Sequence, residues 1–285
     1  FISEVNAGRG PIHMVTMEAF QDPHLEEIGW HNFLGMTVGQ AVLWAATDVN
    51  PKYENPELTT SEPYVMGSHA TGCGAWCSGP EDLSPDEYFW GYNRMTTVEG
   101  LFGAGDAVGG TPHAFSSGSF TEGRLAAKAA VKYIDDGKAE GISVSQEQID
   151  RRGAEIFKPM EHYKIYRNEI VAGDVNPHYH NPRQGLDRLQ KLMDEYAGGA
   201  TVNYMTNEKL LHIGLKKLKV MEEDLEKIAA KDIHELLRAW ELKHRHRASE
   251  SVVQHTLFRK ETRWPGYYYR GDAMKLDDEN WHVLT

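Results

Sequence analysis

Apolar residues recur at every third or fourth position along the second half of the chain. The spacing is clearest in residues 186–196 and 210–242, and it is typical of helices that bury one face. Residues 23–42 show mostly the same spacing, whereas residues 12–15 are predicted to form a short strand. The chain from residue 139 onward is therefore expected to be helical, ending in a loop rich in tyrosine, tryptophan and aspartate.

The middle of the chain follows a different pattern. Glycine becomes frequent after Tyr64, and short apolar strands alternate with tight turns. One strand leads into closely spaced glycines with a carboxylate, in the run 100–110. A helix is predicted over 121–136, with Gly137 as its C-terminal cap. Such an α/β segment can lay its backbone against a large polar cofactor.

The predicted fold class is therefore α/β plus α-helical. Three parts are expected: residues 1–63 as a lid or inserted subdomain, residues 64–138 with the cofactor chemistry, and residues 139–285 as a helical domain. A chain of 285 residues with 40% hydrophobic composition is long enough to bury the cores of two or three such parts.

Charge and cysteine content exclude several functions. Acidic residues outnumber basic ones by 42 to 30, which argues against nucleic acid or an anionic membrane as the main partner. No apolar run approaches the length of a transmembrane helix and no signal segment opens the chain, so a reducing cytoplasm is expected. Cys73 and Cys77 alone cannot supply the four thiolates of an iron–sulfur cluster, so any cluster must belong to another chain.

Asp106 is the carboxylate of the glycine-rich run. It follows Gly103 and Gly105 at the predicted strand end, where a carboxylate can accept hydrogen bonds from sugar or ribityl hydroxyls. An aspartate in a turn can equally satisfy the amides of its own loop, and spacing alone leaves both interpretations open.

A serine-rich segment precedes the predicted helix. It consists of Ser116, Ser117, Gly118 and Ser119. Hydroxyls and free amides at the start of a helix can meet anionic or carbonyl oxygens of a ligand, which favours the ligand interpretation of the preceding carboxylate. The serines are also suited to capping the helix, and both roles can coexist.

Two histidines are catalytic candidates. His69 lies between glycines in residues 64–76, where it can donate hydrogen bonds to an oxyanion or carry a proton near neutral pH. His113 lies inside the glycine-rich loop, with the alternative that it only packs that loop. We interpret Cys73 and Cys77 as small buried side chains without redox activity.

The run 243–247 is the most basic part of an acidic chain. It is suited to docking an acidic partner or to complementing the negative end of a long helix. Most such runs are solvated helix faces, which is the favoured interpretation. The aromatic and charged residues after 263 are expected to pack over another domain or subunit.

These motifs together resemble a known family, the flavoproteins of succinate dehydrogenase and fumarate reductase. The residues that carry the resemblance are Gly103-x-Gly105-Asp106-x-x-Gly109-Gly110, Ser116-Ser117-Gly118-Ser119, and Arg263…Arg270-x-Asp272…Asp277-Asp278-x-x-Trp281. Within that family, residues 8–12, 62–69, 92–101 and 115–119 look specifically like adenylylsulfate reductase alpha subunits.

The resemblance implies a non-covalently bound FAD, the C-terminal part of a Rossmann-like FAD-binding domain, and the end of a capping domain before it. It implies an iron–sulfur beta subunit as partner, carrying two 4Fe-4S clusters. The implied reaction interconverts adenylylsulfate with sulfite and AMP through a flavin N5-sulfite adduct. The alternatives are a dicarboxylate oxidoreductase, disfavoured because the serine-rich segment replaces an asparagine-rich one, and a non-catalytic interaction module.

The resemblance also implies roles for single residues. Asp106 takes the position of the family's ribityl-binding glutamate and is one methylene shorter. The segment Ser117 to Ser119 falls where backbone and hydroxyl groups meet the flavin, and His69 matches an active-site histidine over the flavin.

The chain begins at Phe1, and no strand leads into a G-x-G-x-x-G turn. We therefore expect this to be the C-terminal portion of a flavoprotein. The groups that hold the FAD pyrophosphate and the substrate would then lie upstream, and the portion alone would bind FAD poorly and be inactive.

Overall fold

The computed structural model describes residues 2–36, 38–58, 74–108, 115–171, 175–263 and 269–281. Contacts between residues divide the chain into two compact units. One unit joins Phe1–Pro63 to Arg151–Thr285, and the other is Tyr64–Asp150. Among the described helices, none combines the length and the hydropathy that crossing a bilayer requires.

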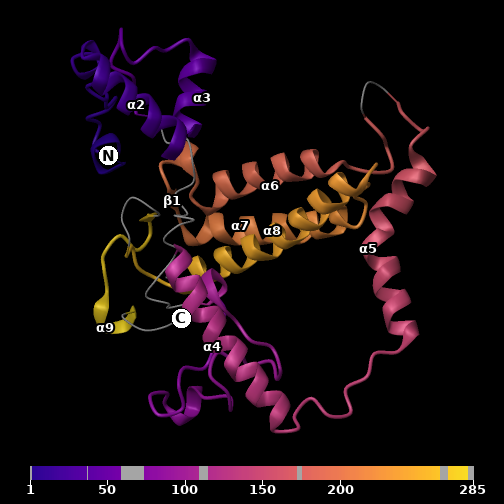
Figure 1. Ribbon diagram of the computed structural model, residues 1–285. Helices are drawn as coiled ribbons and strands as arrows, with labels where there is room; N and C mark the ends of the chain where they lie inside the picture. Colours follow the sequence, from indigo (N-terminus) through magenta and orange to yellow (C-terminus); the bar gives the residue numbers. More distant parts are fainter. Residues whose placement is uncertain are drawn as a thin grey trace. The chain divides into compact units, whose positions relative to one another are not determined.

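Short helices form the first part of the chain (Figure 1). They are α1 (Ile2–Asn6), η1 (Ala19–Gln21), α2 (Pro23–Met36) and α3 (Val38–Thr47). The helical spacing predicted over 23–42 is thereby confirmed. An aromatic cluster in this part contains Phe20, Trp30, Phe33 and Trp44, with neighbouring ring centroids between 4.7 and 6.3 Å apart.

The strand predicted over 12–15 is wrong. Within the described residues of this stretch, only His13 forms a bridge, to Glu57. The ladder stops because the next amides, those of Thr16 and Met17, donate to the side chain of Asn55 at 2.9 and 3.0 Å. A side chain has replaced the backbone partner that a longer strand needs.

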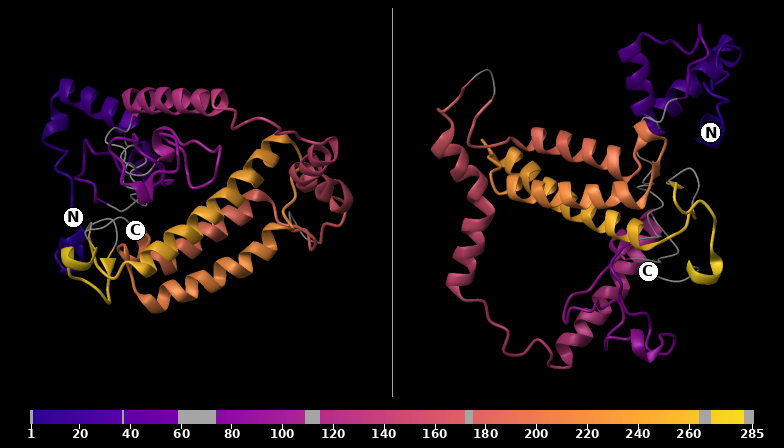
Figure 2. Two further views of the ribbon diagram at one scale, coloured as in Figure 1. Left: turned by 90° about the horizontal axis from the view of Figure 1, so that it is seen from below. Right: turned by 180° about the vertical axis from the view of Figure 1, so that it is seen from behind.

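Three long helices pack together in the second part of the chain (Figures 1 and 2). They are α6 (Pro182–Ala197), α7 (Glu208–Leu225) and α8 (Ile233–Phe258), and each contacts the other two. Their buried side chains form one cluster: Leu189, Leu192, Leu211, Leu218, Met221, Leu225, Ile228, Ala239, Leu242 and Val253. The helical character predicted for this part is confirmed.

The predicted helical stretch 210–242 is divided into two helices. α7 ends at Leu225, and Asp232 caps α8 by accepting a hydrogen bond from the Glu235 amide at 2.9 Å. Between them, Ala229 and Ala230 are almost fully buried. Apolar residues in the turn continue the apolar pattern of the helices, which is why the spacing did not predict the break.

The helix α5 (Gln146–Tyr166) is tied to the connection between α7 and α8. The carbonyl of Pro159 accepts from the Ala230 amide at 2.9 Å, and the carbonyl of Ile156 accepts from Trp240 Nε1 at 3.0 Å. Pro159 is itself buried. These bonds satisfy a turn amide and an indole N–H that the packing would otherwise leave without partners.

The basic run 243–247 lies in the middle of α8, away from both ends of that helix, and Lys243 pairs with Glu226 at the C-terminal end of α7 at 3.4 Å. His246 is 2% exposed, and its Nε2 donates to the Leu218 carbonyl at 2.8 Å. Arg247 pairs with Glu222 of α7. The run therefore contributes to holding α7 against α8.

A short parallel pair of strands joins the connection between α6 and α7 to the segment after α8. It consists of β1 (Met205–Thr206) and β2 (Tyr269–Arg270), preceded by η5 (Ala200–Val202). Arg270, 1% exposed, donates through Nη1 to the carbonyls of Thr256, Leu257 and Arg259, at the end of α8. Its Nε and Nη2 donate to Asp272 at 2.9 and 3.0 Å.

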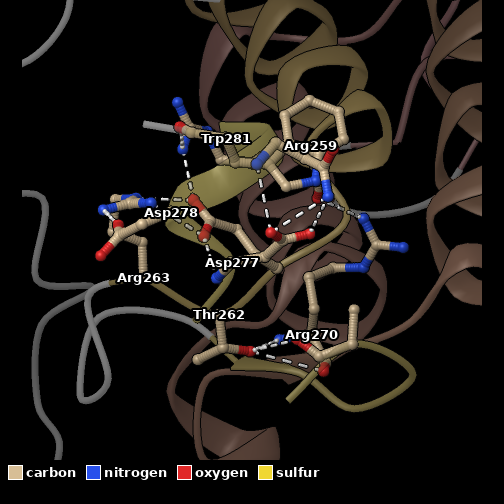
Figure 3. Close-up of polar contacts among 10 residues, drawn as sticks. Arg259, Thr262, Arg263, Arg270, Asp277, Asp278 and Trp281 are labelled. Carbon is tan, nitrogen blue, oxygen red and sulfur yellow. Dashed lines mark hydrogen bonds and ion pairs between the residues drawn. The ribbon is translucent and has the colours of Figure 1, made fainter. Parts of the chain in front are cut away.

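A second buried charge organises the chain end, which includes α9 (Asp278–Trp281) (Figure 3). Glu261 is fully buried and accepts hydrogen bonds from Arg259, from Arg263 at 2.6 and 3.0 Å, and from the Asp277 amide at 2.9 Å. Arg263 also pairs with Asp278 at 2.9 Å. The terminal arginines and aspartates thus form a structural network within this chain.

We expect Gly185→Ala to lower the free energy of unfolding by about 1–3 kcal/mol, because a Cβ there would stand 2.4 Å from Leu242 Cδ2 in the core. Gly153→Ala in α5 is the matched control, since no atom lies within 4 Å of its Cβ position. It should raise stability by about 0.5–1 kcal/mol. Urea unfolding of both variants checks this, and equal stabilities would contradict it.

The Arg270–Asp272 pair should give stability that depends on pH. Hydrogen bonding from Arg270 lowers the pKa of Asp272 from 3.8 to about 2. The contribution is therefore complete above the ordinary pKa and is lost as pH falls through the folded value. Asp272→Asn should cost on the order of 1–2 kcal/mol at pH 7 after solvent screening. Its deficit should shrink between pH 4 and 2 in urea titrations; a constant deficit would refute the assignment.

Candidate functional site

A hairpin in residues 94–103 forms one side of the candidate site. Met95 bridges Phe102, the Thr96 amide donates to the Leu101 carbonyl at 2.8 Å, and the Gly103 amide donates to the Arg94 carbonyl at 2.9 Å. The strand predicted before the glycines is therefore wrong as an extended element: a single bridge residue stands in its place. The backbone hydrogen bonds between its two arms hold the hairpin together.

The helix α4 (Phe115–Asp135) forms the other side. It begins six residues before the predicted start at 121, so the serine-rich segment lies in its first turns. Serine and glycine have low helix propensity, which hid this start in the sequence. Ser116, Ser117 and Ser119 are exposed, whereas Gly118 is buried.

One face of α4 is buried along its length. The buried residues are Gly118, Glu122, Ala126, Ala129 and Tyr133. Four of them are small or aromatic, so the hairpin can approach the helix closely. The exception is a carboxylate in the middle of the stripe.

That carboxylate has a buried partner on the hairpin. Arg94 Nε and Nη2 donate to the two oxygens of Glu122, with Nη2 at 3.0 Å from Oε1. The side chains are 17% and 7% exposed. Further along α4, Tyr133 contacts the rings of Tyr92 and Phe102, with centroids 5.2 and 5.9 Å apart.

The glycine turn, residues 103–106, meets the first turns of α4. Gly105 has a φ of +63°, and a Cβ on it would lie 3.4 Å from Ser119 Oγ. A Cβ on Gly103 would lie 2.7 Å from Cys77 Sγ and 2.9 Å from a Val108 methyl group. The positive φ requires a glycine at position 105, and the close packing requires a glycine at position 103.

Of the predicted site residues, the structure brings the glycine turn and the serine-rich segment together. Asp106 lies within η4 (Gly105–Ala107), directly after the first contact with α4. His69, His113 and Cys73 lie outside the described residues. Burial raises the pKa of the Cys77 thiol, which fits the interpretation of that cysteine as unreactive.

Sequence reasoning did not single out Arg94, Glu122 or Tyr133. A signal was present, because Glu122 interrupts a periodic stripe of small residues on α4. A buried carboxylate needs a cationic partner, and Arg94 in the preceding segment supplies it. No spacing rule would have paired two residues 28 positions apart.

The arrangement is suited to a polar ligand with oxygen acceptors. The first backbone N–H groups of α4 lack partners within the helix, and exposed hydroxyls stand beside them. Gly105 brings bare backbone to the same place. These are features that fit the phosphate and hydroxyl groups of a dinucleotide cofactor.

Comparisons with known proteins identify relatives of the whole chain. Residues 186–285 match the family described as fumarate reductase flavoprotein C-term. The chain is 42% identical over its full length to the adenylylsulfate reductase alpha subunit of Megalodesulfovibrio gigas, and it covers 45% of that protein. It thus spans about half the length of the curated relative it matches.

Solved structures agree with the sequence comparison. Adenylylsulfate reductase from Archaeoglobus fulgidus matches 98% of the chain at 50% identity with a TM-score of 0.83, and 46% of its own chain is covered. An adenosine-5-phosphosulfate reductase in complex with sulfite as a covalent adduct matches equally well. The chain therefore belongs to the fumarate reductase flavoprotein family, among the relatives of adenylylsulfate reductase alpha subunits.

Proposed function

We propose that the protein containing this chain is the FAD-dependent flavoprotein subunit of an adenylylsulfate reductase, which interconverts adenylylsulfate with sulfite and AMP. The observation that carries the proposal is the similarity to such enzymes along the entire chain, at 42% and 50% identity. The glycine turn held against the start of α4 adds a physical reason, because it offers a dinucleotide its usual contacts.

The residues proposed to hold FAD come from the glycine-rich run, the loop that follows it and the serine-rich segment. They are Gly103, Gly105, Asp106, His113, Ser116, Ser117, Gly118 and Ser119. When bound, FAD supplies the two-electron chemistry of its isoalloxazine ring. The glycines let the backbone approach, the carboxylate of Asp106 accepts from ribityl hydroxyls, and the amides and hydroxyls that open α4 donate to cofactor oxygens.

His69 is the proposed catalytic residue. A histidine between glycines can donate hydrogen bonds to an anionic substrate and can hold or release a proton near neutral pH. Sulfite and adenylylsulfate are both anions, so an imidazole that carries a proton would orient them and offset their charge as they enter.

The proposed domain organisation follows the same relationship. Residues 1–63 would be the end of a capping domain, residues 64–138 the last part of a Rossmann-like FAD-binding domain, and residues 139–285 a helical domain. An iron–sulfur beta subunit with two 4Fe-4S clusters is the proposed partner, because the resemblance to adenylylsulfate reductase alpha subunits implies one.

The reaction itself gives the most direct test. In the complex containing this chain, reduction of an artificial acceptor should require both sulfite and AMP, and His69→Ala should reduce its rate by about 100-fold or more. His212→Ala on the exposed face of α7 is the control and should leave the rate unchanged. Turnover of succinate or fumarate without a response to sulfite would replace the proposal with a dicarboxylate oxidoreductase.

The glycine turn gives a second test. Gly105→Ala should weaken FAD binding and cost about 1–2 kcal/mol of stability, because its φ of +63° strains any residue with a Cβ. Gly123→Ala on α4, where no atom lies within 4 Å of the Cβ position, should bind FAD normally. Flavin fluorescence titration of both reconstituted variants measures this. Unchanged affinity in Gly105→Ala would show that the turn does not hold the cofactor.

A further inference from the structure

The Arg94–Glu122 pair is the most buried ion pair between the hairpin and α4 among the described residues of this unit. Two parallel N–H···O contacts fix the guanidinium against the carboxylate, and both side chains are largely withdrawn from solvent. Removing either partner would leave the other charge buried without compensation. The pair therefore fixes the position of whatever is attached to it on each side.

On the helix side, Glu122 lies three residues after Ser119. Residues at this spacing occupy neighbouring positions on one helix face. Ser119 is the residue that meets the Gly105 position, at 3.4 Å from its Cβ site. The carboxylate thus stands one turn from the contact between the glycine turn and the helix.

On the hairpin side, Arg94 is joined directly to the glycine turn. Its carbonyl accepts the hydrogen bond of the Gly103 amide at 2.9 Å, and its own amide donates to the Ser78 carbonyl at 2.8 Å. Its φ is +63°, a conformation that costs free energy for a residue with a side chain. Such a conformation persists only where surrounding contacts hold it, and the forked ion pair is one of them.

We propose that Arg94 and Glu122 are positioning residues for the cofactor: their ion pair holds the turn 103–106 at the start of α4 in the geometry that receives FAD. The inference rests on the proposed function, because it takes this turn to be an FAD contact. Neither side chain is assigned a contact with the cofactor. The pair acts through the backbone of Gly103 and the helix turn that carries Ser119.

A purely structural role would lower stability without changing the cofactor site. The Lys132–Asp136 pair offers a matched control, because it lies at the other end of α4 and is far more exposed, at 67% and 39%. Lys132→Gln removes an ion pair from the same helix without touching the turn.

The test uses the complex containing this chain, with FAD removed and added back. Arg94→Lys keeps the positive charge but loses the two parallel hydrogen bonds of the guanidinium. Glu122→Asp keeps the negative charge on a shorter side chain. If Arg94→Lys does not fold, Glu122→Asp decides the outcome. Each should raise the dissociation constant for FAD about ten-fold and accelerate amide hydrogen exchange in residues 99–108. The double variant should be little worse than either single one, whereas Lys132→Gln should match the wild type in both measurements.

Wild-type FAD affinity and wild-type exchange in folded Arg94→Lys or Glu122→Asp would overturn the inference, even where their melting temperatures fall. A wild-type complex that contains no FAD would instead overturn the proposed function, so the two failures are distinguishable.

Discussion

The close approach of the 94–103 hairpin to α4 is the constraint on which the candidate site depends. A helix face of small residues permits the approach. Glu122 and Tyr133, about three turns apart on α4, hold the hairpin through Arg94 and Phe102. Without these contacts the glycine turn would have no fixed relation to the serines that open the helix. The site is thus a product of packing between two simple elements, because neither the hairpin nor the helix start makes it alone.

Two buried arginines, Arg94 and Arg270, have different structural roles in this chain. Arg94 joins segments 28 residues apart and supports the geometry beside the proposed cofactor. Arg270, in the other unit, satisfies carbonyl groups at the end of α8. Both carry a forked contact to a carboxylate, which is how a guanidinium is withdrawn from water at acceptable cost. Similar chemistry therefore serves a candidate site in one unit and a helix terminus in the other.

Periodic patterns predicted the long helices, and they did so because burial of one face determines both sequence and structure there. The spacing in 186–196 corresponds to α6, and the spacing in 210–242 to most of α7 and the first part of α8. The turn between the last two could not be predicted, because buried alanines continue the apolar pattern through it. The hairpin was equally hidden, since its strands are too short for a period to appear. The glycines and serines marked two segments that the structure brings together, whereas Arg94 and Glu122 depend on a contact that only the tertiary structure reveals.

The Arg270–Asp272 pair also has a direction. Asp272 accepts from the Glu208 amide at the start of α7, where the helix dipole is positive, and Arg270 donates to carbonyls at the end of α8, where it is negative. Because α7 and α8 are antiparallel neighbours, the start of α7 and the end of α8 lie together. Arg270 and Asp272, two positions apart in the sequence, can therefore offset the partial charges of both helix ends. The arrangement cannot be inverted: exchanging the two charges would keep the ion pair but set each charge against a helix end of its own sign. The polarity of the motif is therefore fixed by the helices around it.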